Sequence, residues 1–177
     1  MKITALLTLF VLALSVVVFA QQDKSKRPSP PAQAQCKFSD GKTITLDYSS
    51  PRAKGRKIFG ELVPYGEVWR TGANEATTFV TTANLNAGGK DIPAGNYTIF
   101  TIPEQDKWTL IINKHTGEWG IPYKYESEEL ARIPMSASKT SAAVENFTIS
   151  FDQSGGACTL QLSWENTQAS LKFNEKK

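Results

Sequence analysis

Residues 147–173 read FTISFDQSGGACTLQLSWENTQASLKF, and apolar residues recur there at every second position. In 147–151, Phe and Ile alternate with polar residues, and in 158–164, Cys, Leu and Trp do the same. A period of two is typical of a strand that packs one face on a hydrophobic core. The glycines at 155–156 predict a turn between these strands, and residues 166–168 predict a second turn before the alternation resumes.

Similar short runs lie upstream, at residues 44–48, 77–82, 97–102 and 108–113, separated by turns rich in Gly, Pro and Asp. About eight to ten short strands in one domain predict an all-β fold, an antiparallel β-sandwich, with a small barrel or jelly roll as the alternative. Only Ser127–Arg132 is predicted to be helical, with Ser127 as the N-cap.

Composition limits the function classes. The chain has 177 residues, 40% of them hydrophobic, which fits one globular domain. Its 20 basic and 17 acidic residues lack the basic excess of a nucleic-acid-binding protein, so no nucleic-acid partner is expected. One histidine and two cysteines exclude a His-rich or four-cysteine zinc site. We therefore predict no metal and no cofactor.

The N-terminus predicts export. Residues 1–20 have a positive start, an apolar run and small residues before a polar stretch, as in a cleaved signal peptide. An uncleaved membrane anchor is the alternative, although the run is short for a membrane span. Residues 21–35 are polar and proline-rich and predict a disordered tether before a single β domain at 36–177. The mature protein is expected to be periplasmic or extracellular, with no membrane span after cleavage.

The stretch 49–76 has no strand pattern, and such long loops are often functional. Its centre combines an aromatic ring, a guanidinium, a hydroxyl, an amide and a carboxylate, while Arg56 belongs to a cluster of four cations at 52–57. Arginine binds carboxylates and phosphates through paired hydrogen bonds. The candidate ligand-binding residues are therefore Arg56, Trp69, Arg70, Thr71, Asn74 and Glu75, with the loop residue Trp119 as a further aromatic candidate.

The same residues carry a resemblance. The motifs YSSP (48–51), GRKIFG (55–60), LVPYGEVWRTGANEAT (62–77) and IPAGNY (92–97) resemble those of a secreted bacterial family of unknown function, number 2911. Ser50 stands where that pattern often has arginine. The resemblance implies an exported domain over about residues 40–170, but it implies no particular activity.

Three functional hypotheses remain open. The first is a non-catalytic ligand-binding or interaction domain with a polar pocket around residues 51–77, whose partner is a small molecule, a glycan or a protein. The second is an extracytoplasmic hydrolase that uses Glu75 as a base with Arg70 or Asn74, or a carboxylate pair of Glu75 and Glu118. The third assigns the motif a purely structural role, in which Arg70 and Glu75 pair to fix the loop.

The two cysteines, Cys36 and Cys158, leave a further choice. In an exported protein, two such cysteines can form one disulfide. Cys158 also lies on the inward face of its predicted strand, where a free buried thiol is equally compatible with the pattern.

Overall fold

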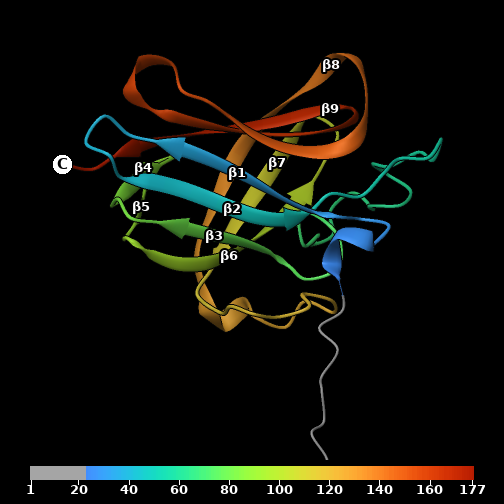
Figure 1. Cartoon of the computed structure of the whole chain (residues 1–177), viewed down its shortest axis with the longest axis horizontal. Coiled ribbons are helices and arrows are strands. Elements are labelled where there is room, and N and C mark those ends of the chain that lie inside the picture. The colour runs from blue at the N-terminus through green and yellow to red at the C-terminus, as the bar shows by residue number, and fades with distance from the viewer. Residues whose placement is uncertain (1–22) are drawn as a thin grey trace, which may run out of the picture.

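The computed structural model describes residues 23–177, so the predicted signal peptide lies outside the described residues. One nine-stranded antiparallel sheet has the strand order β1-β2-β3-β6-β7-β8-β9-β4-β5 (Figure 1). The strands are β1 (Pro31–Lys37), β2 (Thr43–Ser49), β3 (Thr77–Thr81), β4 (Leu85–Ala87), β5 (Lys90–Ile92), β6 (Gly95–Pro103), β7 (Lys107–Asn113), β8 (Glu129–Asp152) and β9 (Cys158–Glu175).

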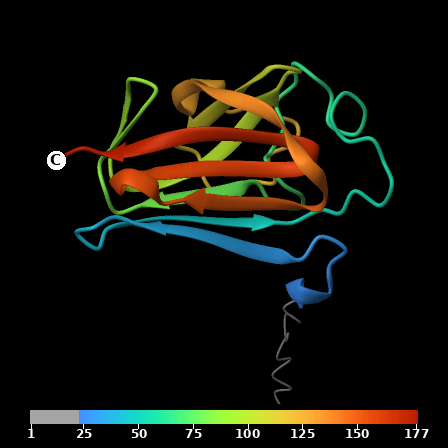
Figure 2. The same ribbon diagram turned by 90° about the horizontal axis from the view of Figure 1, so that it is seen from above.

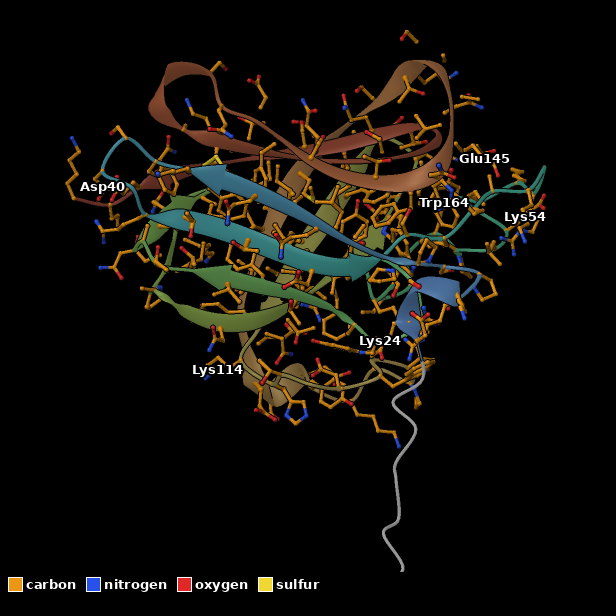
Figure 3. All side chains as sticks on the ribbon, in the orientation of Figure 1. Lys24, Asp40, Lys54, Lys114, Glu145 and Trp164 are labelled. Carbon is orange, nitrogen blue, oxygen red and sulfur yellow. A yellow bond between two sulfur atoms is a disulfide. The ribbon has the colours of Figure 1, made fainter. Side chains whose placement is uncertain are left out.

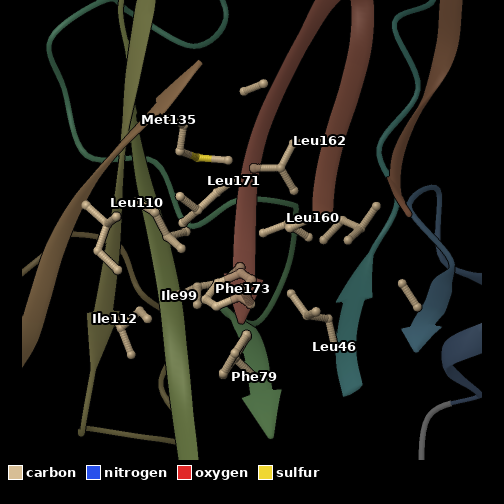
Figure 4. Close-up of a cluster of buried hydrophobic side chains, with 14 of the residues drawn as sticks. Leu46, Phe79, Ile99, Leu110, Ile112, Met135, Leu160, Leu162, Leu171 and Phe173 are labelled. Carbon is tan, nitrogen blue, oxygen red and sulfur yellow. The ribbon is translucent and has the colours of Figure 1, made fainter. Parts of the chain in front are cut away.

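The sheet folds over on itself, so that β8 and β9 lie across β1 and β2 (Figures 1 and 2). It does not close into a barrel, and the all-β sandwich prediction is confirmed. Inward-facing side chains of the two layers form one core, because the alternating residues of each strand point to the same face. Figure 4 shows part of this core, with Leu46, Phe79, Ile99, Leu110, Ile112, Met135, Leu160, Leu162, Leu171 and Phe173.

A disulfide joins the two layers. Cys36 in β1 and Cys158 in β9 are bonded, with their Cα atoms 6.0 Å apart. Both residues are buried. The choice left open by the sequence is therefore settled in favour of the bridge.

Two local predictions are wrong. The predicted helix at Ser127–Arg132 is a single 3-10 turn, Glu126–Glu128, followed directly by β8. Ala131, Ile133 and Met135 alternate into the core there and pair with β7, which outweighs the weak helix signal of six residues.

The predicted turn at 166–168 is also wrong, because β9 continues through it. The buried positions change from even numbers up to Trp164 to odd numbers from Ala169 onward. Glu165, at φ 53°, lies where the β8–β9 register shifts, so a bulge rather than a turn absorbs the change of parity.

The predicted tether is shorter than expected. Residues 31–35 belong to β1, which pairs with β2 from Pro31↔Ser49 to Lys37↔Thr43. Ala34 and Cys36 are buried on the inward face, so this segment gains core contacts as well as backbone hydrogen bonds. The polar residues of β1 face outward, and composition alone does not show that the residues between them are buried. The composition of the segment therefore predicts disorder.

Candidate functional site

The loop between β2 and β3 is fixed to β8. The amide of Phe147 donates to Pro51 O (2.9 Å), and the amide of Ala53 donates to Glu145 O (2.8 Å). The carboxylate of Glu145 accepts from the amide of Lys54 (2.9 Å), and its carbonyl accepts from Trp164 Nε1 (3.2 Å). Figure 3 shows Lys54, Glu145 and Trp164 together at this side of the molecule. These bonds give the long loop a defined conformation.

Trp69 anchors the middle of the loop in the core. Its ring stacks on that of Trp164, with the ring centroids 5.9 Å apart, and meets the ring of Phe147 edge-on, with the centroids 4.9 Å apart. Phe59 and Trp108 complete the cluster around it. Only 8% of Trp69 is exposed, and its Nε1 donates to Gly72 O (3.0 Å), so the one polar atom of the ring is satisfied.

A tight turn follows Trp69. Thr71 (φ 55°) and Asn74 (φ 58°) both have left-handed backbone conformations, which are rare for a β-branched residue such as threonine. Buried hydrogen bonds hold the turn: Thr77 Oγ1 donates to Thr71 O (2.7 Å), and the Thr71 and Thr101 hydroxyls lie 3.1 Å apart. These bonds give the turn a defined conformation.

A pocket of about 730 Å³ lies between this loop and the segment 121–126. Most of its lining is apolar, and two lining side chains, Leu62 and Ile121, are 45% and 55% exposed. Its apolar lining includes Leu62, Val63, Val68, Trp69, Ile121 and Tyr123, and its charged lining consists of Arg56, Arg70, Glu67 and Glu126. The pocket is thus less polar than the sequence predicted.

The structure places the predicted site residues in two groups. Arg56, Trp69 and Arg70 line the pocket, whereas Thr71, Asn74, Glu75 and Trp119 do not. The sequence did not identify the apolar lining at Leu62, Val68 and Ile121. The only signal for these residues in the sequence is that they are apolar residues in irregular, proline-containing segments. Exposed single apolar residues are common in soluble proteins, so this signal does not indicate a pocket.

Asn74 and Glu75 contact the segment that precedes β1. Asn74 Nδ2 donates to Ser29 O (3.1 Å), and Arg27 Nη1 donates to both carboxylate oxygens of Glu75 (3.0 and 2.8 Å). Lys24 Nζ lies 3.1 Å from Glu75 Oε1. Partial burial raises the pKa of Glu75, but the hydrogen bonds from Arg27 and Lys24 outweigh it and lower the pKa to about 2.

We expect the Arg27→Met, Lys24→Met double variant to raise the pKa of Glu75 from about 2 toward its ordinary value of 4.5. NMR titration of the Glu75 carboxyl carbon measures this directly. Because the folded-state pKa lies below the unfolded one, the contact stabilises the protein above pH 4.5 and is lost as the pH falls toward 2. The stability effect should be about 1 kcal/mol or less, since the pair is partly exposed.

Lys42→Met is a matched control, because Lys42 pairs with Asp40 and Glu175 elsewhere on the surface. It should leave the Glu75 titration unchanged. A Glu75 pKa that stayed near 2 in the double variant would show that these two cations are not its cause.

Glu118 is also outside the pocket. It is buried, and within residues 23–177 neither of its carboxylate oxygens has a hydrogen-bond partner. Neither carboxylate of the predicted Glu75–Glu118 pair therefore lines the pocket.

Trp119, the residue after Glu118, is 54% exposed, and the guanidinium of Arg70 lies 5.1 Å from the centroid of its ring.

In the part of the chain that the structure describes, no group of three or more His, Cys, Asp or Glu side chains is placed to hold a metal ion. None of the helices among residues 23–177 has the length and apolarity needed to cross a membrane.

Comparison with curated proteins found no match, and comparison with solved structures found none either. The model of one protein family matches residues 29–173, which include β1 and extend into β9. The match covers the whole β2–β3 loop, the segment 121–126 and the other two lining residues, Ser29 and Trp164, and therefore every residue that lines the pocket. The chain belongs to the family described as "Protein of unknown function (DUF2911)".

Proposed function

We propose that the protein is an exported, non-catalytic binding domain that takes a small molecule into the pocket between the β2–β3 loop and segment 121–126. The observation that carries the proposal is the combination of a fixed concave wall with an exposed apolar rim. Trp69 and Trp164 are held in the core at the base of the loop, while Leu62 and Ile121 face solvent. Small-molecule sites are typically concave and mostly apolar, with few polar groups.

The exposed rim supplies a driving force for binding. Covering a half-exposed Leu or Ile side chain contributes about 1 kcal/mol. Because Glu145 and the β8 backbone already hold the loop, little ordering is needed when a ligand enters. The pocket is large enough for a ligand with several rings or a medium-length alkyl chain.

Export is supported by two observations. The N-terminal sequence has the pattern of a cleaved signal peptide. The Cys36–Cys158 disulfide is typical of proteins that fold in an oxidising compartment. The proposed location is therefore the periplasm or the extracellular space.

The two rival hypotheses receive less support. A general base works best with a pKa near the working pH, whereas the pKa of Glu75 is about 2. A purely structural motif accounts well for Trp69, Thr71, Asn74 and Glu75, each of which has intramolecular partners. It accounts less well for Arg70, which does not pair with Glu75.

The experiment is ligand-observed NMR with a library of aromatic and aliphatic fragments, followed by the Leu62→Ser, Ile121→Ser double variant. Hits on the wild type should lose about 30-fold in affinity in the variant, because it removes both apolar side chains of the rim, at about 1 kcal/mol each. Tyr65→Ser is the control, since Tyr65 is an exposed apolar residue of the same loop that does not line the pocket.

The absence of any hit on the wild type would count against the pocket. So would hits whose affinity changes equally in the double variant and in Tyr65→Ser.

A further inference from the structure

Arg70 differs from the other arginines of the described chain. Arg27 and Arg132 each bind a carboxylate, and Arg52 and Arg56 each donate two hydrogen bonds within their own loop. Within residues 23–177, Arg70 has no carboxylate within 4.0 Å and makes a single long hydrogen bond, from Nη1 to Trp119 O (3.3 Å). Most of its donors are therefore free.

The guanidinium is nevertheless held in place. It lies over the Trp119 ring at 5.1 Å, where the negative face of the indole attracts a cation. The chain at Gly120 passes close to the base of the Arg70 side chain: a Cβ on this glycine would lie 3.3 Å from Arg70 Cβ and 2.9 Å from Ala76 Cβ. A guanidinium whose position is fixed loses less freedom when it binds an anion.

Arg70 also lies in a partly desolvated position at the pocket wall. Burial lowers the pKa of the guanidinium, and the charge of Glu75 offsets this only in part. A cation that is partly removed from water and has no ion-pair partner is stabilised when an anion is placed beside it.

We infer that the ligand of this pocket is an organic carboxylate, whose carboxylate group accepts paired hydrogen bonds from Arg70 while its apolar part contacts Leu62, Val68 and Ile121. This inference rests on the proposed function. The planar fork of the guanidinium matches a carboxylate, with two parallel N–H···O bonds.

The charges of the pocket favour a monoanion. Arg56 and Arg70 are balanced by Glu67 and Glu126 in the lining, so the site carries no net charge. Two of the five N–H donors of Arg56 are engaged by the carbonyls of Ala53 (2.9 Å) and Arg52 (2.6 Å), whereas Arg70 makes one long bond, so Arg70 is the better available anchor. Because the lining is balanced, a monoanion adds less net charge to it than a doubly charged phosphate does.

The test compares two probes of nearly equal size, naphthalene-2-carboxylate and naphthalene-2-methanol, by isothermal titration calorimetry on the mature protein. We expect the carboxylate to bind about 10- to 100-fold more tightly than the alcohol. Arg70→Met keeps an unbranched side chain and removes the charge, so it should abolish this difference and leave the alcohol within twofold of its wild-type affinity.

Arg52→Met is the matched control, because this arginine belongs to the same loop, does not line the pocket and donates to Ser50 O and Ser50 Oγ. It should leave the preference for the carboxylate within twofold. Arg70→Lys provides a second variant if Arg70→Met does not fold. Because lysine keeps the charge and lacks the fork, we expect about 5- to 10-fold weaker binding of the carboxylate.

Equal affinity of the two probes would overturn the inference and leave the apolar pocket intact. A carboxylate preference that survives in Arg70→Met, or is lost equally in Arg52→Met, would overturn the role of Arg70. Failure of both probes to bind would also overturn the inference, and the fragment library then decides separately whether the pocket binds other molecules.

Discussion

Replacing both Cys36 and Cys158 with alanine is expected to lower the free energy of unfolding by about 4 to 5 kcal/mol. The bridge closes a loop of 122 residues, and the chain-entropy model assigns larger effects to longer loops. For a domain of this size, the melting temperature should fall by about 10 to 20 °C. Alanine is preferred to serine because both sites are buried, where an unpaired hydroxyl would add its own cost.

Two comparisons isolate the bridge. Wild-type protein unfolded by urea in the presence of a thiol reductant should match the double variant, while the oxidised wild type should remain more stable. The single variant Cys36→Ala should not be more stable than the double variant, because it has lost the same bridge. A reduced wild type as stable as the oxidised protein would contradict the prediction.

The bridge illustrates what the sequence predicts well and what it does not. Period-two alternation placed Cys158 on the inward face of a strand, and that placement is confirmed. Alternation does not indicate which strand lies opposite Cys158 in the other layer of the sandwich. Pairing Cys36 with Cys158 depends on β1 joining the sheet, which composition had assigned in part to a tether.

The candidate site was predictable only in part, for a similar reason. The sequence singled out residues 69–75 as the unusual part of the loop, and the structure shows a strained, hydrogen-bonded turn there. Asn74 and Glu75 appeared available because their partners, Ser29 and Arg27, are more than 40 positions away. Polar residues close in sequence can therefore contact different parts of the chain.

The segment before β1 has a structural role that its composition concealed. Lys24, Arg27 and Ser29 contact Asn74 and Glu75 in the turn, and the amide of Ser50 donates to Pro30 O (2.9 Å). A segment rich in proline and lysine has too little apolar surface to form a core, which is why the sequence favours disorder. Here it gains order from hydrogen bonds and ion pairs to a surface that is already folded.

Trp69→Ala is expected to lower the free energy of unfolding by about 3 to 5 kcal/mol, the usual range for a buried tryptophan. The substitution removes the ring that packs between Trp164, Phe147 and Phe59 and leaves Gly72 O without its donor. Because Trp69 connects the loop to the core, the loop should also lose protection from proteolysis before the sheet unfolds.

Trp119→Ala is the control, since it removes a ring of the same size that is 54% exposed. Its effect on stability should be within about 0.5 kcal/mol, as for most surface substitutions. Urea unfolding of the two variants, monitored by circular dichroism, gives the two free energies of unfolding to be compared. Equal stability losses would mean that the aromatic cluster does not fix the loop. A large loss confined to Trp69→Ala would instead separate the two roles within the motif: Trp69 holds the wall of the pocket, and Arg70, with Trp119 beneath it, remains free for the proposed ligand.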